Sequence, residues 1–210
     1  MVESNLPILF LKEVVLLPFN EIRIELSGLK EKEIVNIADS SRNGYLVCIN
    51  LEDSKEENPN IRSLPKIGIL SKIKSKIELP NGIIRLVLIG IDRVEILNYI
   101  EEDNINAFII PTKEYDYSLE EANALKRMII RSLNEYIEIS PYISNNVLGR
   151  INGINNIGRL ADIIAYELPI DYIDKLKYIT TPSSISRLRL ILEDLNKEIN
   201  TVKLETEIES

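Results

Sequence analysis

The spacing of hydrophobic residues along the chain changes near Tyr117. Before this point, β-branched residues come in short runs that turn-forming residues separate, which is typical of β-strands. After it, apolar residues recur every three or four positions, as on one face of an α-helix. The first half is predicted to hold one helix, at residues 29–41 with Ser27 as its N-cap. It is also predicted to hold six strands, at residues 8–11, 21–26, 45–50, 67–79, 83–99 and 107–111.

The sequence Leu79-Pro80-Asn81-Gly82 predicts a hairpin between the two longest strands. An Asn-Gly pair favours the positive φ angles of a type I′ turn, and long apolar runs lie on both sides of it. A second turn is expected where Phe19 follows Pro18, between the first two strands.

The second half is predicted to be helical. Ser118 and Glu121 form a capping box at the start of its first helix, which Pro141 ends. Three shorter helices are expected at residues 144–151, 157–167 and 171–179. The last helix is predicted to begin with Thr181 as N-cap and Pro182 in its first position.

The last helix carries a short heptad pattern that would pack on the helices before it. Apolar residues become rare from Asn200 to Ser210, and no C-capping residue follows. We therefore expect the chain to end inside a longer helix, as a fragment of a larger protein. The residues of the heptad pattern are Leu188, Leu192, Leu195, Ile199 and Val202.

Composition narrows the possible functions. The chain has 210 residues and a formal net charge of −8, which disfavours nucleic acid as a partner. It contains no histidine, which removes the commonest general base and metal ligand, and a single cysteine excludes a structural zinc site.

Cys48 lies in an apolar run, so we expect it to be a buried, inert thiol. No signal peptide or membrane span is predicted, and the expected location is the cytoplasm.

The remaining motifs do not complete a catalytic or cofactor site. Gly153 and Gly158 have the spacing of a phosphate-binding loop, but no Lys-Ser/Thr pair follows them and no strand precedes them. The acidic segments 52–57 and 101–103 lack the spacing of a calcium loop and are interpreted as solvated loops. No catalytic, cofactor-binding or metal-binding residue is predicted, although a small enzyme that uses carboxylates stays as an alternative.

Three lysines alternate along one predicted strand, at Lys72, Lys74 and Lys76. Alternation predicts that their side chains share one face of the sheet. Such a stripe would bind phosphate or acidic groups, or it would be a solvated face or an edge strand charged against aggregation, and the latter interpretation is favoured.

Five motifs in order resemble the N-terminal domain of the ATP-dependent Lon protease family. The resemblance extends from Leu6 to about Glu198, and it departs from the family pattern at Ile89 and within residues 58–64. The motifs are the opening Leu6-Pro7 through Leu17-Pro18, Gly68, the hairpin Leu79-Pro80-Asn81-Gly82 with Gly90 and Arg93, the segment Arg159-Leu160-Ala161-Asp162 through Leu168-Pro169, and Arg187-Leu188.

This resemblance implies an α+β fold with a β-rich subdomain, a twisted sheet or partly open barrel with one helix, at residues 1–115. A helical bundle that ends in a long exit helix follows at residues 116–210. The implied role is non-catalytic recognition of unfolded or damaged polypeptides in protein quality control, with self-association and a hexamer in the full-length protease. ATP and magnesium would bind only in an ATPase domain that this chain lacks. The alternative is a stand-alone binding protein of the same fold.

Exposed apolar residues at two predicted turns are the candidates for polypeptide contact. Pro18 and Phe19 lie at the first turn, and Leu79 and Pro80 lie at the hairpin. A buried Phe19 is the alternative, in which case its ring would belong to the core.

Overall fold

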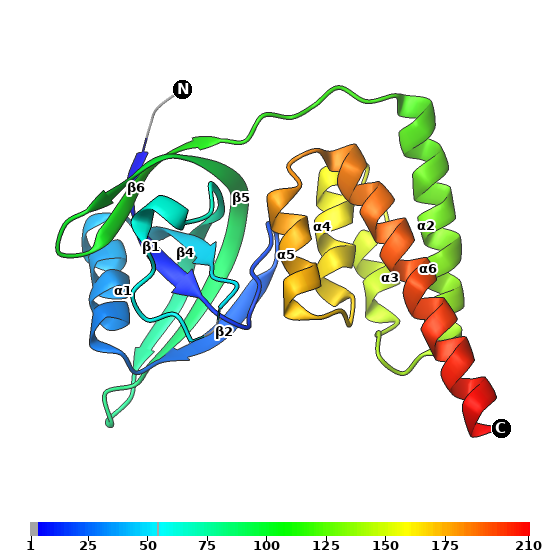
Figure 1. The fold of residues 1–210 in the computed structure, drawn as a ribbon, viewed down its shortest axis with the longest axis horizontal. Helices are drawn as coiled ribbons and strands as arrows, with labels where there is room; N and C mark the ends of the chain where they lie inside the picture. Colours follow the sequence, from blue (N-terminus) through cyan, green and yellow to red (C-terminus); the bar gives the residue numbers. More distant parts are fainter. Residues whose placement is uncertain (1–3, 54) are drawn as a thin grey trace. The chain divides into compact units, whose positions relative to one another are not determined.

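The computed structural model describes residues 4–53 and 55–210, which form two compact units. The first unit comprises the residues up to Thr112 together with Tyr172–Thr180, and the second comprises Lys113–Asp171 and Thr181–Ser210. Strands dominate the first unit, which also holds two α-helices, and helices form the second (Figure 1). The predicted α+β class is therefore confirmed.

The first unit contains a six-stranded sheet in the order β2-β5-β4-β3-β1-β6. An additional pairing of β5 with β6 closes five of the strands into a barrel-like ring, while β2 extends the sheet beside β5. Strands β1 and β3 are parallel, and the other pairs are antiparallel. The strands are β1 (Ser4–Leu11), β2 (Glu21–Leu26), β3 (Tyr45–Asn50), β4 (Ile67–Glu78), β5 (Ile84–Glu101) and β6 (Ile105–Pro111).

Alternation along the strands gives the ring two buried surfaces. One is a cluster contributed by β1, β3, β5 and β6. Residues of β1 and β3 with the opposite orientation, such as Leu9 and Cys48, are also buried, because α1 (Leu29–Ser41) packs on these two strands. The first cluster consists of Leu6, Ile8, Val47, Ile49, Val94, Ile96, Ala107 and Ile109.

The hairpin between β4 and β5 forms as predicted, but its turn type differs. Leu79 N donates to Ile83 O at 2.8 Å, and Gly82 N donates to Leu79 O at 2.9 Å. Gly82 has a positive φ of 83°, whereas Asn81 does not have a positive φ. The loop is therefore a type I turn, with Pro80 in the position that proline favours, followed by a left-handed glycine.

The second unit contains α2 (Leu119–Ile139), α3 (Asn146–Ile151), α4 (Ile157–Glu167) and α6 (Ser184–Glu209). Ser118 caps α2 by accepting a bond from Glu121 N at 3.3 Å. The Glu121 side chain binds Arg189 instead of completing the capping box. A short 3₁₀ helix in the first unit, η1 (Ile61–Ser63), completes the elements together with the helix α5 (Tyr172–Thr180).

Two predicted N-caps are wrong. The N-cap of α1 is Gly28 and not Ser27. The N-cap of α6 is Ser183, whose side chain accepts from Ser186 N at 3.3 Å. The predicted cap Thr181 and the following Pro182 lie before the helix, because their carbonyl oxygens accept bonds from Arg187 at 3.0 and 2.8 Å.

Helix α5 (Tyr172–Thr180) comes from the helical half of the sequence but makes its contacts within the first unit, where it packs on β4. At its first residue, Tyr172 Oη donates to Leu51 O at 2.7 Å and accepts from Asn50 Nδ2 at 3.2 Å. Near its end, the buried Arg93 donates to Tyr178 O through Nε at 3.1 Å. A guanidinium group at a helix C-terminus satisfies a carbonyl that the helix leaves open.

A buried ion pair connects α4 and α6. Asp162 and Arg187 are both almost fully buried, and Arg187 Nε lies 3.3 Å from Asp162 Oδ1. Gly158 lies against this pair, because an added Cβ atom would come within 2.9 Å of Arg187 Nη2. The Arg-Leu-Ala-Asp and Arg-Leu motifs of the sequence therefore meet in one interaction in the core of the second unit.

Candidate polypeptide-binding surfaces

The turn before β2 presents Phe19 in a strained conformation. Pro18 is buried, and Asn20 N donates to Leu17 O at 3.2 Å across the turn. Phe19 has a φ of 69°, the left-handed region that glycine or asparagine usually occupies at this position of a type II turn. Its side chain is 46 % exposed, so the alternative of a buried Phe19 is wrong.

Gly90 holds this turn against β5. Phe19 N donates to Gly90 O at 2.9 Å, and Gly90 N donates to Asn20 O at 2.9 Å. An added Cβ atom on Gly90 would come within 2.2 Å of Leu17 O, which only glycine avoids. The glycine of the hairpin motif therefore allows the Phe19 turn to approach the strand closely.

The two candidate pairs lie at opposite ends of β2. Phe19 lies beside Gly90, whereas the Leu79-Pro80 tip follows the pairing of Glu78 with Ile84. Gly90 lies six positions after Ile84 on β5, which corresponds to about 20 Å at the usual rise of a strand. Leu79 is half-buried and Pro80 is exposed. The structure therefore does not gather the four candidate residues into one site.

A shallow groove lies on the face of β2, β5 and β4 between these two ends. Ile77 is 55 % exposed there, and Val87 shares its face because Ser75 pairs with Val87 and Ile77 with Arg85. Arg85 Nε binds Glu25 Oε1 at 3.0 Å. The sequence pattern did not single out Ile77 and Val87, although each lies within an alternating run that could have indicated an exposed apolar residue.

The three alternating lysines do not form one stripe. A register shift lies between Ile73 and Ser75, and the lysines contact three different groups. Lys72 lies over the ring of Tyr45, 5.0 Å from its centroid. Lys74 pairs with Glu21 of β2, and Lys76 pairs with Asp39 of α1 at 3.0 Å. The prediction of a shared lysine face is therefore wrong, because the bulge breaks the alternation.

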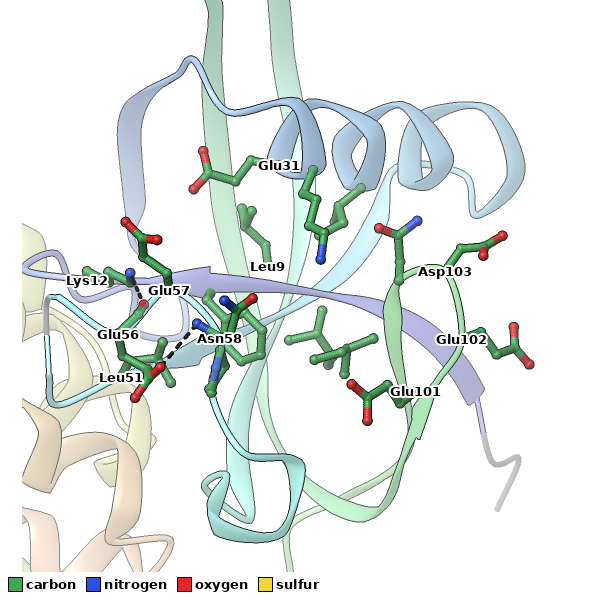
Figure 2. A pocket seen from close by; sticks show the side chains of 17 residues that line it. Leu9, Lys12, Glu31, Leu51, Glu56, Glu57, Asn58, Glu101, Glu102 and Asp103 are labelled. Carbon is green, nitrogen blue, oxygen red and sulfur yellow. Dashed lines mark hydrogen bonds between the residues drawn. The ribbon is translucent and has the colours of Figure 1, made fainter.

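A cavity of about 210 Å³ opens at one end of the ring, between α1, the segment after β3 and the β5–β6 hairpin (Figure 2). Its lining is apolar where Leu9, Phe10 and Ile105 contribute, and acidic around the opening. Figure 2 shows Glu31 on α1, Glu56 and Glu57 on the segment after β3, and the acidic hairpin residues on the other side. Glu56 and Glu57 of one acidic segment and residues 101–103 of the other, both interpreted from the sequence as solvated loops, therefore contribute to one cavity.

Local hydrogen bonds hold the segment after β3 in place. Lys12 Nζ donates to the carbonyl oxygen of Glu56, and Asn58 N donates to Glu56 Oε1 at 3.1 Å. Both interactions are drawn in Figure 2. The cavity wall is thus attached to the end of β1.

Within the described ranges, 4–53 and 55–210, no group of three or more acidic, histidine or cysteine side chains is arranged to hold a metal ion. Cys48 is 1 % exposed, and burial raises the pKa of its thiol to about 12. Burial also raises the pKa of Tyr99, whose hydroxyl donates to Pro65 O. Both groups are held in their neutral forms.

Among the described residues, 4–53 and 55–210, no helix combines the length and apolar character needed to cross a membrane.

Comparison with known proteins finds one family across nearly the whole chain. The family model of the ATP-dependent protease La (LON) substrate-binding domain matches residues 5–197. The chain is 30 % identical over 207 residues to a Lon protease of Brevibacillus choshinensis, covering 98 % of this chain and 26 % of that protein. It is 26 % identical over 208 residues to Lon protease 1 of Bacillus subtilis strain 168, covering 98 % and 27 %. The chain thus spans about a quarter of the length of these relatives.

Solved structures show the same fold. The N-terminal domain of a Mycobacterium avium complex Lon protease superposes with a TM-score of 0.74 at 17 % identity, over 92 % of this chain and 98 % of that one. A Lon N-terminal domain protein from Xanthomonas campestris gives a TM-score of 0.58 at 15 % identity, over 90 % and 98 %. Together with the family match over residues 5–197, these findings confirm the resemblance: the chain belongs to the family of Lon protease substrate-binding domains.

Proposed function

We propose that this chain recognises unfolded or damaged polypeptides for a Lon-type ATP-dependent serine protease, as its non-catalytic recognition and assembly domain. Membership of the Lon substrate-binding family supports this role. The observation that carries it is Phe19, which the fold holds exposed in a conformation that is unfavourable for a non-glycine residue. Strain of this kind is kept where the surrounding structure enforces it, and it concentrates at binding and catalytic sites.

The contact surface is the face that runs from Phe19 to Leu79 and Pro80, with Ile77 between them, while the buried Pro18 only shapes the turn. Exposed apolar side chains along an extended face suit an unfolded chain, whose apolar residues are accessible along its length. One domain buries little area, so its affinity is expected to be low.

The larger setting is part of the same proposal. The chain itself would hydrolyse neither ATP nor peptide, and ATP and magnesium would act in a separate ATPase domain of the protease. The protease would work in cytoplasmic protein quality control as a hexamer, with this domain aiding assembly. Nucleic acid and membranes are not expected partners, since a net charge of −8 repels phosphate backbones.

Titration with a permanently unfolded polypeptide of low net charge tests the contact surface. Phe19→Gly should weaken binding several-fold and leave the domain as stable as before or up to about 1 kcal/mol more stable, because glycine removes the strain at this φ at a cost in backbone entropy. Binding of this polypeptide should change little between low and high salt, since apolar burial is not screened.

Phe19→Ala is the matched control, because it removes the ring but keeps the Cβ atom and its strain. It should bind as weakly as Phe19→Gly without any gain in stability. If both variants unfold the domain, Phe19 supports the core and this surface is wrong. If the wild-type chain binds no unfolded polypeptide but self-associates, its role is in assembly alone.

The stand-alone alternative has a separate test. A reading frame that continues past Ser210 into an ATPase domain supports the protease, whereas a stop codon after Ser210 supports an independent binding protein.

A further inference from the structure

The acidic cavity at the end of the ring carries a large share of the charge of the molecule. Six carboxylates line it, at Glu31, Glu56, Glu57, Glu101, Glu102 and Asp103, against the two ammonium groups of Lys12 and Lys30. The difference is a formal charge of −4, to which Glu102 and Asp103 contribute from outside the opening; the four acids that surround the opening exceed the two lysines by two charges. A concave site lined by one sign of charge attracts ligands of the opposite sign more strongly than the same charges on a flat surface.

The interior of the cavity is largely apolar. Ile8, Leu9 and Ile34 line it and are buried, and Leu51 and Ile105 contribute further apolar surface. Its volume of about 210 Å³ is smaller than the roughly 300–1,000 Å³ of most small-molecule sites. The cavity therefore has room for an apolar side chain but not for a typical cofactor.

We propose that this cavity binds an apolar side chain of a polypeptide that has lysine or arginine residues on either side of it. This inference rests on the proposed function and narrows it, since it names the class of segment that the domain prefers. The apolar side chain would enter between Leu9 and Ile105, and the flanking cations would lie near Glu31, Glu57 and Glu101. Figure 2 shows that these acids come from three elements around the opening, with Glu102 and Asp103 directed away from it.

The charge complementarity explains why a polypeptide and not a free cation is the occupant. Among the described residues, no acidic group at the cavity is arranged to hold a metal ion, whereas a chain with both kinds of side chain satisfies the largely apolar interior and the rim together. The cavity also lies apart from the Phe19 turn, which packs on β5 at Gly90. The two surfaces can therefore be tested separately.

Three short fluorescent peptides with the same central leucine test the proposal, with lysine, serine or glutamate on both sides of it. The wild-type chain should bind the lysine peptide about threefold to tenfold more tightly than the serine peptide, given the modest strength of exposed ion pairs. This advantage should shrink at high salt. A nitroxide on the lysine peptide should broaden the amide signals of Phe10, Leu51 and Ile105.

The variant Glu31→Gln/Glu57→Gln/Glu101→Gln removes one exposed acid from each side of the opening. The control Glu205→Gln/Glu207→Gln/Glu209→Gln makes the same change in net charge on the exposed end of α6. Only the first variant should lose the preference for lysine flanks, and thermal unfolding checks that both remain folded.

Equal losses in both variants would mean that net charge alone attracts the peptide, and they would overturn the proposal. Binding of the serine peptide without a preference for lysine flanks would also overturn it, while the proposed function would stand. Binding of the lysine peptide alone would support the cavity and contradict the apolar contacts at Phe19.

Discussion

Asp162 and Arg187 lie in two of the motifs on which the resemblance of the sequence to the Lon family rests. Each side chain is almost fully buried, and Arg187 also binds the carbonyl oxygens of Thr181 and Pro182. A buried pair of this kind adds little net stability by itself, because both charges leave water. Removing either of the two charged side chains is costly, because the other charge then stays buried without its partner.

Asp162→Asn should therefore lower the free energy of unfolding by about 3–5 kcal/mol. Urea denaturation followed by circular dichroism measures the change. Replacing both residues, as in Asp162→Asn/Arg187→Met, should recover part of the loss because no unpaired charge remains. A single variant as stable as the wild type would show that solvent reaches Arg187 in solution.

The Cys48 thiol couples stability to alkaline pH. Burial raises its pKa from 9.0 to about 12. Between these values the unfolded chain releases the thiol proton while the folded chain keeps it, so unfolding becomes easier as the pH rises. Buried tyrosines such as Tyr99 shift in the same direction. The contribution of Cys48 is fully present below about pH 9 and is lost as the pH rises through 12.

Cys48→Ala should reduce the loss of stability between pH 8 and pH 11, although it lowers the stability at pH 8 by leaving a small cavity. Guanidinium denaturation at the two pH values compares the variant with the wild type. An unchanged pH dependence would mean that Cys48 ionises normally in the folded chain, and rapid reaction of the native thiol with a disulfide reagent would show the same.

At the scale of elements, α5 is the segment that the sequence pattern assigns to the wrong neighbours. Its helical period predicts its existence, but its place in the first unit depends on Arg93 and Tyr172. A fragment of residues 1–115 would lack α5 and leave Arg93 without the carbonyl oxygen of Tyr178. Residues 1–115 should therefore fold poorly, despite holding every strand.

Adding residues 172–180 to this fragment through a flexible linker should restore a dispersed amide spectrum and a cooperative urea transition. Tyr172→Phe in the linked fragment should cost about 1–3 kcal/mol, because the carbonyl oxygen of Leu51 loses its donor. A well-folded fragment without α5 would contradict this role of the helix.

Local sequence patterns predicted the helices and strands well, because the interactions that form these elements act between residues close in the sequence. All the strands except β1 begin and end within two residues of the predicted bounds, since alternation and turn residues define them. Pairings between distant strands, such as β1 with β6, have no local signal, and neither does the bulge that separates the three lysines. The N-cap of α6 shifted to Ser183 because Arg187 occupies two carbonyl groups before it.

The candidate binding surfaces also depend partly on local sequence patterns and partly on pairings between distant segments. A turn at Phe19 follows from Pro18, but the positive φ and the exposure of the ring depend on the close approach of Gly90 to Leu17. The acidic segments 52–57 and 101–103 are visible in the sequence, but only the pairing of β1 with both β3 and β6 brings Glu56 and Glu57 to one cavity with residues 101–103. Function that arises from such long-range pairing is not visible in one-dimensional patterns.

At the scale of the whole molecule, two separate surfaces on the first unit suit a domain that binds a long polypeptide weakly at several places. An unfolded chain offers many apolar segments, so neighbouring domains can bind one polypeptide at the same time. The second binding event then occurs within a complex, at an effective concentration set by the connection between the domains. In the hexamer proposed above, six such domains would hold a long substrate far more tightly than one domain can.

Two copies of the chain joined by a flexible Gly/Ser linker imitate this situation. About 30 linker residues give a root-mean-square span of about 30 Å, which is comparable to the size of one unit. The joined copies should bind a long unfolded polypeptide about tenfold to a hundredfold more tightly than a single copy does. A short peptide with one apolar segment should bind both forms equally, because it cannot reach two domains.

A joined pair with Phe19→Gly in one copy should lose most of the gain in affinity for a neutral substrate. Equal affinities of the single and joined forms for the long polypeptide would show that substrate capture does not depend on repeated weak contacts.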